Sequence, residues 1–240
     1  MRCLLAVIMI FSAQLSLAMS PFQQHLNSTA QSISAFYMYE MTEGDEKFLN
    51  EFKQHQADAS RALGNSTELQ KSLFEDRWQK MIPHWKFNLV KGVGLNFEAV
   101  VRLQVRRYLT DLYLYSKELP INQTIVESKV DIIKVNTSIL SARTLDLVSA
   151  HNGSNSLTEH DLQLDSKAIA AQVQENITQL LDMKLEKNQT KSLKKVRTQF
   201  NFVEKSLVDH NQVVPYFLVY RNIMRLGKLL DESTQKVAGF

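Results

Sequence analysis

Apolar residues recur every three or four positions along most of the chain, which is the period of an amphipathic helix. The clearest stripe covers 97–119 and predicts a helix about 35 Å long. A weaker apolar cluster, 33–37, precedes the others. Further stripes lie at 48–63, 74–85, 126–147, 162–180, 193–207 and 219–230. With no linker, internal repeat or coiled-coil-length stripe, this pattern predicts an all-α fold: a single domain of about six helices, built as a bundle or an elongated array.

Several short motifs mark where these helices start. Thr67 with Gln70 and Thr124 with Glu127 have the spacing of a capping box, and Thr158 with Asp161 is a looser match. Gly92-Val93-Gly94 has half of a dinucleotide-binding turn, but the third glycine is absent and no βαβ pattern surrounds it. We interpret it as a connection between two helices.

Residues 1–18 have the three parts of a secretory signal peptide. Arg2 is followed by an apolar run, 4–11, and by the small residues Ser16 and Ala18. Cleavage after Ala18 would leave a mature chain, 19–240, without a cysteine, because Cys3 is the only one. The alternative interpretation is an N-terminal membrane anchor. No later apolar stretch is long enough to span a bilayer, so we expect a secreted, soluble protein without disulfides.

Sequons for N-glycosylation are more frequent than chance predicts. Random placement of the Asn, Ser and Thr residues of 19–240 would give about two. The chain has seven, at Asn27, Asn65, Asn122, Asn136, Asn152, Asn176 and Asn188. We therefore predict an extracellular glycoprotein, with these asparagines as candidate glycosylation sites.

The predicted helices suit some of these sites better than others. Asn65, Asn122, Asn152 and Asn188 fall in or beside connections, and Asn176 flanks an apolar stripe. Asn136 is less easily placed. It shares a row with Lys129 and Arg143 that we expect to face solvent, although apolar rows lie on both sides. That helix therefore packs on two partners, or Asn136 is unmodified.

Charge does not indicate a nucleic-acid-binding protein, because the chain has 28 basic and 25 acidic residues. The basic run 193–198 has a spacing associated with heparin-like polyanions. On a helix, however, its charges together with Lys191 spread over more than 100°, which favours a solvated face. A second basic cluster contains Arg102, Arg106 and Arg107.

No sequence motif indicates catalysis, a cofactor or a metal, so we predict no catalytic, cofactor-binding or metal-ligating residues. The six histidines are scattered, and a metal shared by His151, His160 and Asp161 is less expected than solvated loop histidines. Tyrosines and tryptophans lie at helical spacing, which favours core positions over a ligand pocket.

These observations lead to a function hypothesis and two alternatives. The first is a non-catalytic, secreted, glycosylated module that binds another extracellular protein or a cell surface. The second is a carrier of lipid or another small hydrophobic ligand, since a bundle without disulfides can open along its helix faces. An enzyme whose active site has no recognisable motif is the third.

Overall fold

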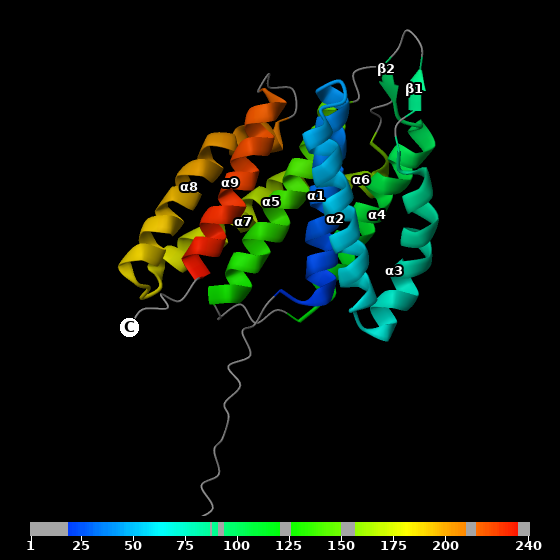
Figure 1. Ribbon diagram of the computed structural model, residues 1–240. Coiled ribbons are helices and arrows are strands. Elements are labelled where there is room, and N and C mark those ends of the chain that lie inside the picture. Colours follow the sequence, from blue (N-terminus) through cyan, green and yellow to red (C-terminus); the bar gives the residue numbers. More distant parts are fainter. Residues whose placement is uncertain are drawn as a thin grey trace, which may run out of the picture.

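Long helices packed side by side form the body of the computed structural model (Figure 1), which describes residues 19–86, 88–90, 94–120, 126–149, 157–209 and 215–234. The eight long helices within these ranges are α1 (Pro21–Met41), α2 (Glu46–Gly64), α3 (Glu68–Met81), α4 (Ala99–Glu118), α5 (Val126–Ser149), α7 (Ser166–Asp182), α8 (Lys187–Val208) and α9 (Tyr216–Thr234). The shorter elements are the 3₁₀ turn η1 (Ile82–His84), the strands β1 (Asn88–Val90) and β2 (Gly94–Asn96), and the single-turn helix α6 (Glu159–Leu162).

The all-α prediction is confirmed, but the expected number of about six helices is too low. The main omission is α1, of which the sequence showed only the cluster 33–37. Seven consecutive residues of this helix, 32–38, are buried. The first half of α1 does carry an apolar row, Phe22, Leu26, Ala30 and Ile33, but it ends in this continuously buried segment. A segment enclosed on all sides needs no polar face, so its burial leaves no amphipathic stripe to detect.

Small side chains allow the neighbours of α1 to approach closely. Ser34 donates a hydrogen bond from Oγ to Ser141 Oγ of α5 at 3.1 Å, and Ser32 donates to the Phe52 carbonyl of α2 at 3.3 Å. Beyond Met41 the chain reverses through Gly44, whose φ of 102° suits glycine. α1 thus lies between α2 and α5, as Figure 1 shows.

α5 is the second enclosed helix, with every residue from 135 to 146 buried. It packs on α1 on one side and on α7, α8 and α9 on the other. Our expectation of a solvated row on this helix was wrong, because Lys129, Asn136 and Arg143 are 5%, 5% and 8% exposed. α6 and α7 cover that row: Lys129 bonds Gln179, Asn136 bonds Gln172, and Arg143 bonds Asp161.

An aromatic cluster fills the space between α1, α2, α3 and α4. Trp78 and Tyr108 stack with ring centroids 5.6 Å apart, and Phe36 meets Phe97 edge to face at 4.6 Å. Trp78 and Tyr108 are almost completely buried. These aromatic residues are core, as their helical spacing predicts.

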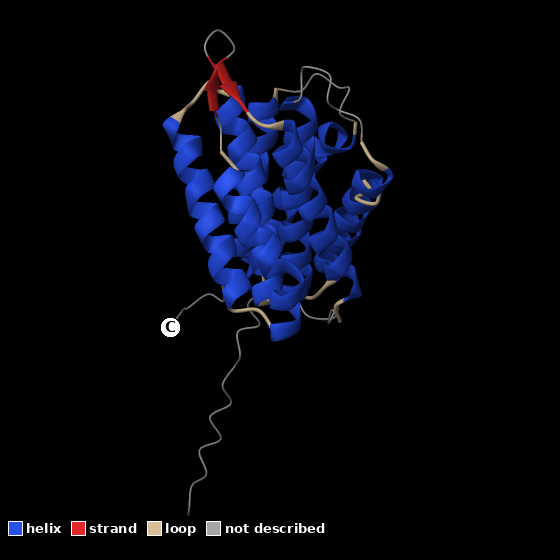
Figure 2. Cartoon of the chain, turned by 90° about the vertical axis from the view of Figure 1, so that its right-hand side faces the viewer, coloured by secondary structure: helices blue, strands red, loops and turns tan. Residues whose placement is uncertain are grey.

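The connections differ from expectation in two places. The predicted link between α3 and α4 contains an antiparallel hairpin, in which Leu89 pairs with Leu95, and Figure 2 shows it at one end of the bundle. The predicted stripe 162–180 is broken, because Leu162 ends α6 and is 58% exposed. A new helix, α7, starts at Ser166, where the Asp165 side chain caps its first turn, and Leu164 is buried instead.

Two predicted capping boxes are present. Thr67 and Gln70 cap α3 reciprocally, and Thr158 and Asp161 do the same for α6. Thr124 lies outside the described residues.

Candidate functional site: a buried arginine–carboxylate network

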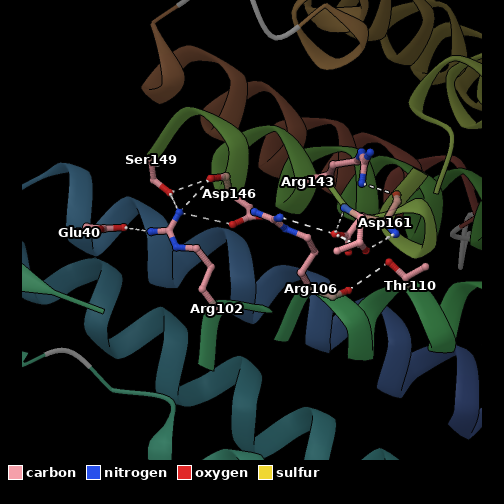
Figure 3. Close-up of polar contacts among 9 residues, drawn as sticks. Glu40, Arg102, Arg106, Thr110, Arg143, Asp146, Ser149 and Asp161 are labelled. Atoms are coloured by element: carbon pink, nitrogen blue, oxygen red, sulfur yellow. Dashed lines mark hydrogen bonds and ion pairs between the residues drawn. The ribbon is translucent and has the colours of Figure 1, made fainter. Parts of the chain in front are cut away.

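Three arginines and three carboxylates meet where α1, α4, α5 and α6 come together (Figure 3). Arg102 and Arg106 come from successive turns of α4, and Arg143 and Asp146 from successive turns of α5. Glu40 lies near the end of α1, and Asp161 lies in α6. Their positive and negative charges are equal in number.

Arg102 connects α4 with the ends of two other helices. Its Nη2 lies 3.2 Å from Glu40 Oε2, and its Nη1 donates to Ser149 Oγ at 3.0 Å and to the Asp146 carbonyl at 3.2 Å. The guanidinium also lies 4.8 Å from the centre of the Tyr37 ring, within the range of a cation–π interaction. Arg102 therefore fixes the ends of α1 and α5 against α4.

Arg106 lies between two carboxylates. Its Nε donates to Asp146 Oδ2 at 2.6 Å, and its Nη1 lies 3.7 Å from Asp161 Oδ2. Charge-assisted bonds as short as the first are the strong ones in proteins. Arg106 thus connects α4 directly to α5 and across to α6.

α6 is attached to the bundle by the same network. Asp161 Oδ2 accepts bonds from the backbone N–H and the hydroxyl of Thr158, both at 2.9 Å, and so completes the cap of α6. Arg143 Nη1 donates to the Asp161 backbone carbonyl at 3.0 Å. A helix of one turn is not stable alone, so these contacts hold it in place.

Burial and neighbouring charges shift the pKa values of three groups in the network. Burial lowers the pKa of Arg106, but Asp146 and Asp161 outweigh it and raise the pKa overall. Burial and the neighbouring Arg106 lower the pKa of Arg143, while burial raises the pKa of Glu40 despite Arg102. The strongest pairing is therefore between Arg106 and Asp146.

A cavity of about 10 Å³ lies beside Arg106, Arg143 and Asp146. This is room for about one water molecule. Within the described residues, neither Nη atom of Arg106 forms a hydrogen bond, so donors remain for a guest of that size. The network therefore has the geometry of a structural link between helices, and the cavity is too small for an organic substrate.

The arginines of the second basic cluster do not form a surface patch. Arg102 and Arg106 are buried at 7% and 6% exposure, and only Arg107 is exposed. Sequence reasoning missed the network because its acidic partners lie 40 or more residues away from these arginines. The available signal was the charged row of α5, enclosed by apolar rows on both sides.

The candidate glycosylation sites differ in exposure. Asn65, at the C-cap of α2, and Asn188, in the first turn of α8, are exposed. Asn27 is half-buried in α1. Asn122 and Asn152 lie outside the described residues.

The two remaining candidate glycosylation sites are buried between helices. Asn136 is 5% exposed and donates from Nδ2 to Gln172 Oε1 at 2.9 Å; Asn176 is 6% exposed and donates from Nδ2 to the Gln172 carbonyl at 2.8 Å. Nδ2 is the atom that carries a glycan, and a glycan at either position would separate α5 from α7. Asn176 is thus more enclosed than its flanking position suggested.

The histidines in the described part of the chain do not gather. His160 Nε2 lies 2.8 Å from Asp111 Oδ1, and His25 is fully enclosed in the aromatic cluster. His151 and His210 lie outside the described residues. In the part of the chain that the structure describes, no group of three His, Cys, Asp or Glu side chains is placed to hold a metal ion. Among the described helices, none combines the length and hydropathy of a membrane span.

In comparisons with known proteins, no protein-family model matches this chain, and no curated protein or solved structure is similar to it.

Proposed function

We propose that this chain is a secreted, N-glycosylated, non-catalytic helical protein that acts by binding a partner outside the cell. The observation that carries this proposal is the excess of sequons behind a leader-like segment, together with the exposure of Asn65 and Asn188 at helix ends. At helix ends a glycan meets solvent and disturbs no helix packing.

The charged network does not provide a catalytic acid–base pair. Catalytic acid–base pairs need carboxylates in different environments beside a substrate. Here Asp146 and Asp161 are engaged by arginines or by a helix cap, and the adjacent cavity admits one water molecule. The constellation of charges thus contributes to the fold, and we assign the function to the solvent-facing helices.

Expression in cultured eukaryotic cells tests secretion and glycosylation together. The proposal predicts protein in the medium that begins at Met19 and carries glycans at Asn65 and Asn188, located by glycopeptide mass spectrometry. Asn65→Gln and Asn188→Gln should each remove one glycan. Asn136→Gln and Asn176→Gln are the matched buried controls and should leave the glycan mass unchanged. An uncleaved, unglycosylated chain confined to the cytosol would contradict the proposal.

Lipid analysis separates the binding module from the carrier alternative. Purified secreted protein is extracted with organic solvent, and the extract is examined by mass spectrometry. A binding module should release no stoichiometric lipid, and capture from extracellular fluid should recover a macromolecule instead. One lipid per protein molecule would favour the carrier.

A further inference from the structure

We propose that a groove between α8 and α9 binds a linear sulfated polysaccharide. These two helices lie side by side at one edge of the molecule (Figure 1). The groove has a volume of about 700 Å³. Its charged lining residues are Lys187, Lys191, Lys194, Lys195 and Arg225.

The lysines form one face of α8. Their positions advance by four, three and one residue, which keeps all four within about 100° around the helix axis. Arg197, which the basic run of the sequence includes, lies outside this face and does not line the groove. The structure therefore selects a different set of cations from the sequence run: Arg197 is left out, Lys187 is included, and α9 adds Arg225 from the opposite wall.

These five charges are not neutralised by the protein. Within the described residues, none of them forms an ion pair, and no acidic side chain lines the groove. A concave surface lined by one sign of charge concentrates ligands of the opposite sign. The groove is therefore complementary to a polyanion.

A second basic hollow shows the contrast. It lies between α3 and α4, has a volume of about 440 Å³, and is lined by Arg77, Lys80 and Arg107 among others. There Arg77 pairs with Asp111 at 2.7 Å, and Lys80 pairs with Asp76 at 2.7 Å. Two of its three Arg and Lys side chains thus already form ion pairs with aspartates, so this hollow provides a matched control.

The remaining lining favours a polysaccharide among polyanions. Thr190 donates its hydroxyl hydrogen to the carbonyl of the N-cap residue Glu186, and Thr198 donates to the Lys194 carbonyl. Both hydroxyl oxygens line the groove and keep lone pairs that can accept from sugar hydroxyls. No aromatic side chain is among the described lining residues, whereas binding of single-stranded nucleic acid relies on base stacking. A concave groove also fits a linear polysaccharide better than it fits the flat surface of a lipid bilayer. The choice of an extracellular polysaccharide rests on the secretion proposed above.

Heparin, as a sulfated probe, tests the groove on the purified full chain by titration calorimetry at several NaCl concentrations. The wild type should bind at about 0.15 M salt. Lys191→Gln with Lys194→Gln should weaken binding about tenfold and lower the slope of log K against log[NaCl] by about 1.5. Arg225→Gln alone should weaken binding too, because it acts from the other wall.

The control is Lys80→Gln with Arg107→Gln, which removes the same charge from the second hollow and should change the affinity less than twofold. Equal weakening by both double variants would overturn the proposal, as would preference for anionic phospholipid vesicles or single-stranded DNA over heparin at equal salt. A secreted protein that ignores heparin refutes this inference alone. A heparin-binding protein retained in the cytosol refutes the proposed function instead.

Discussion

His25 is a fully buried histidine with a defined tautomer. Its Nδ1 lies 2.8 Å from the Ala59 carbonyl, which can only accept, so Nδ1 carries the proton. Nε2 then accepts from the Tyr108 hydroxyl at 2.8 Å. Burial lowers the pKa of His25 from 6.5 to about 4, although the bond to Ala59 acts in the opposite direction. The folded protein therefore holds a neutral imidazole where an unfolded chain would bind a proton.

Acid should destabilise the fold through this residue. Because the pKa is lower in the folded state, stability is complete above pH 6.5 and is lost as the pH falls towards 4. The loss should reach about 3 kcal/mol at the lower end. Urea unfolding between pH 7.5 and 4 measures it.

The contribution of His25 is isolated by comparing variants, since Asp131 and Glu40 also have shifted pKa values. His25→Gln should be less stable at neutral pH but should have a flatter stability curve between pH 6.5 and 4. His84→Gln removes an exposed histidine and should keep the wild-type slope. If His25→Gln keeps that slope as well, His25 is not the titrating group.

At the scale of helices, the sequence predicted those with one solvent-facing side. In α8, Leu193, Val196, Phe200, Val203 and Leu207 are all buried, as their spacing indicated. The two enclosed helices were harder to predict. In α1 the segment 32–38 is buried on every side, so it has no polar face that would mark a stripe. In α5 the buried polar and charged side chains are satisfied by partners distant in sequence. The spacing of apolar residues therefore could not predict the buried arginine–carboxylate network. The capping boxes of α3 and α6 depend only on residues three positions apart, and they were predicted correctly.

α6 should be the element most sensitive to a single buried contact. Arg143→Met keeps much of the side-chain volume but removes the bond to the Asp161 carbonyl. A hydrogen bond from a charged donor contributes about 1.5 kcal/mol or more, so opening of α6 should become about tenfold more frequent. Amide hydrogen exchange of residues 158–164, measured by NMR, should become about tenfold faster. The amides of α7 should keep their protection.

Lys129→Met is the control for this prediction. Lys129 lies on the same row of α5 but bonds Gln179 of α7. It should leave exchange in α6 unchanged. Equal acceleration by both substitutions would mean that α5 as a whole has loosened.

At the scale of the whole molecule, α5 belongs to two groups of helices. It packs on α1, which in turn packs on α2 and α4. It also packs on α7, α8 and α9. One continuous hydrophobic cluster runs from Phe22 to Leu230 through these contacts. We therefore expect the described helices to unfold in a single cooperative transition.

Both tryptophans of the chain, Trp78 and Trp85, lie in the aromatic cluster on the α1–α4 side, so their fluorescence reports on that side alone. Phe200→Ala creates a cavity on the other side, in α8, where Phe200 is fully buried. Its cost should be about 3–5 kcal/mol. Because α5 couples the two groups, the urea midpoint from tryptophan fluorescence should fall as far as the midpoint from far-UV circular dichroism.

The control is Phe202→Ala, which changes a residue two positions along the same helix that is 63% exposed. It should move neither midpoint. A fluorescence midpoint that stays in place while the dichroism transition splits would show that the two groups unfold independently and that α5 does not couple them.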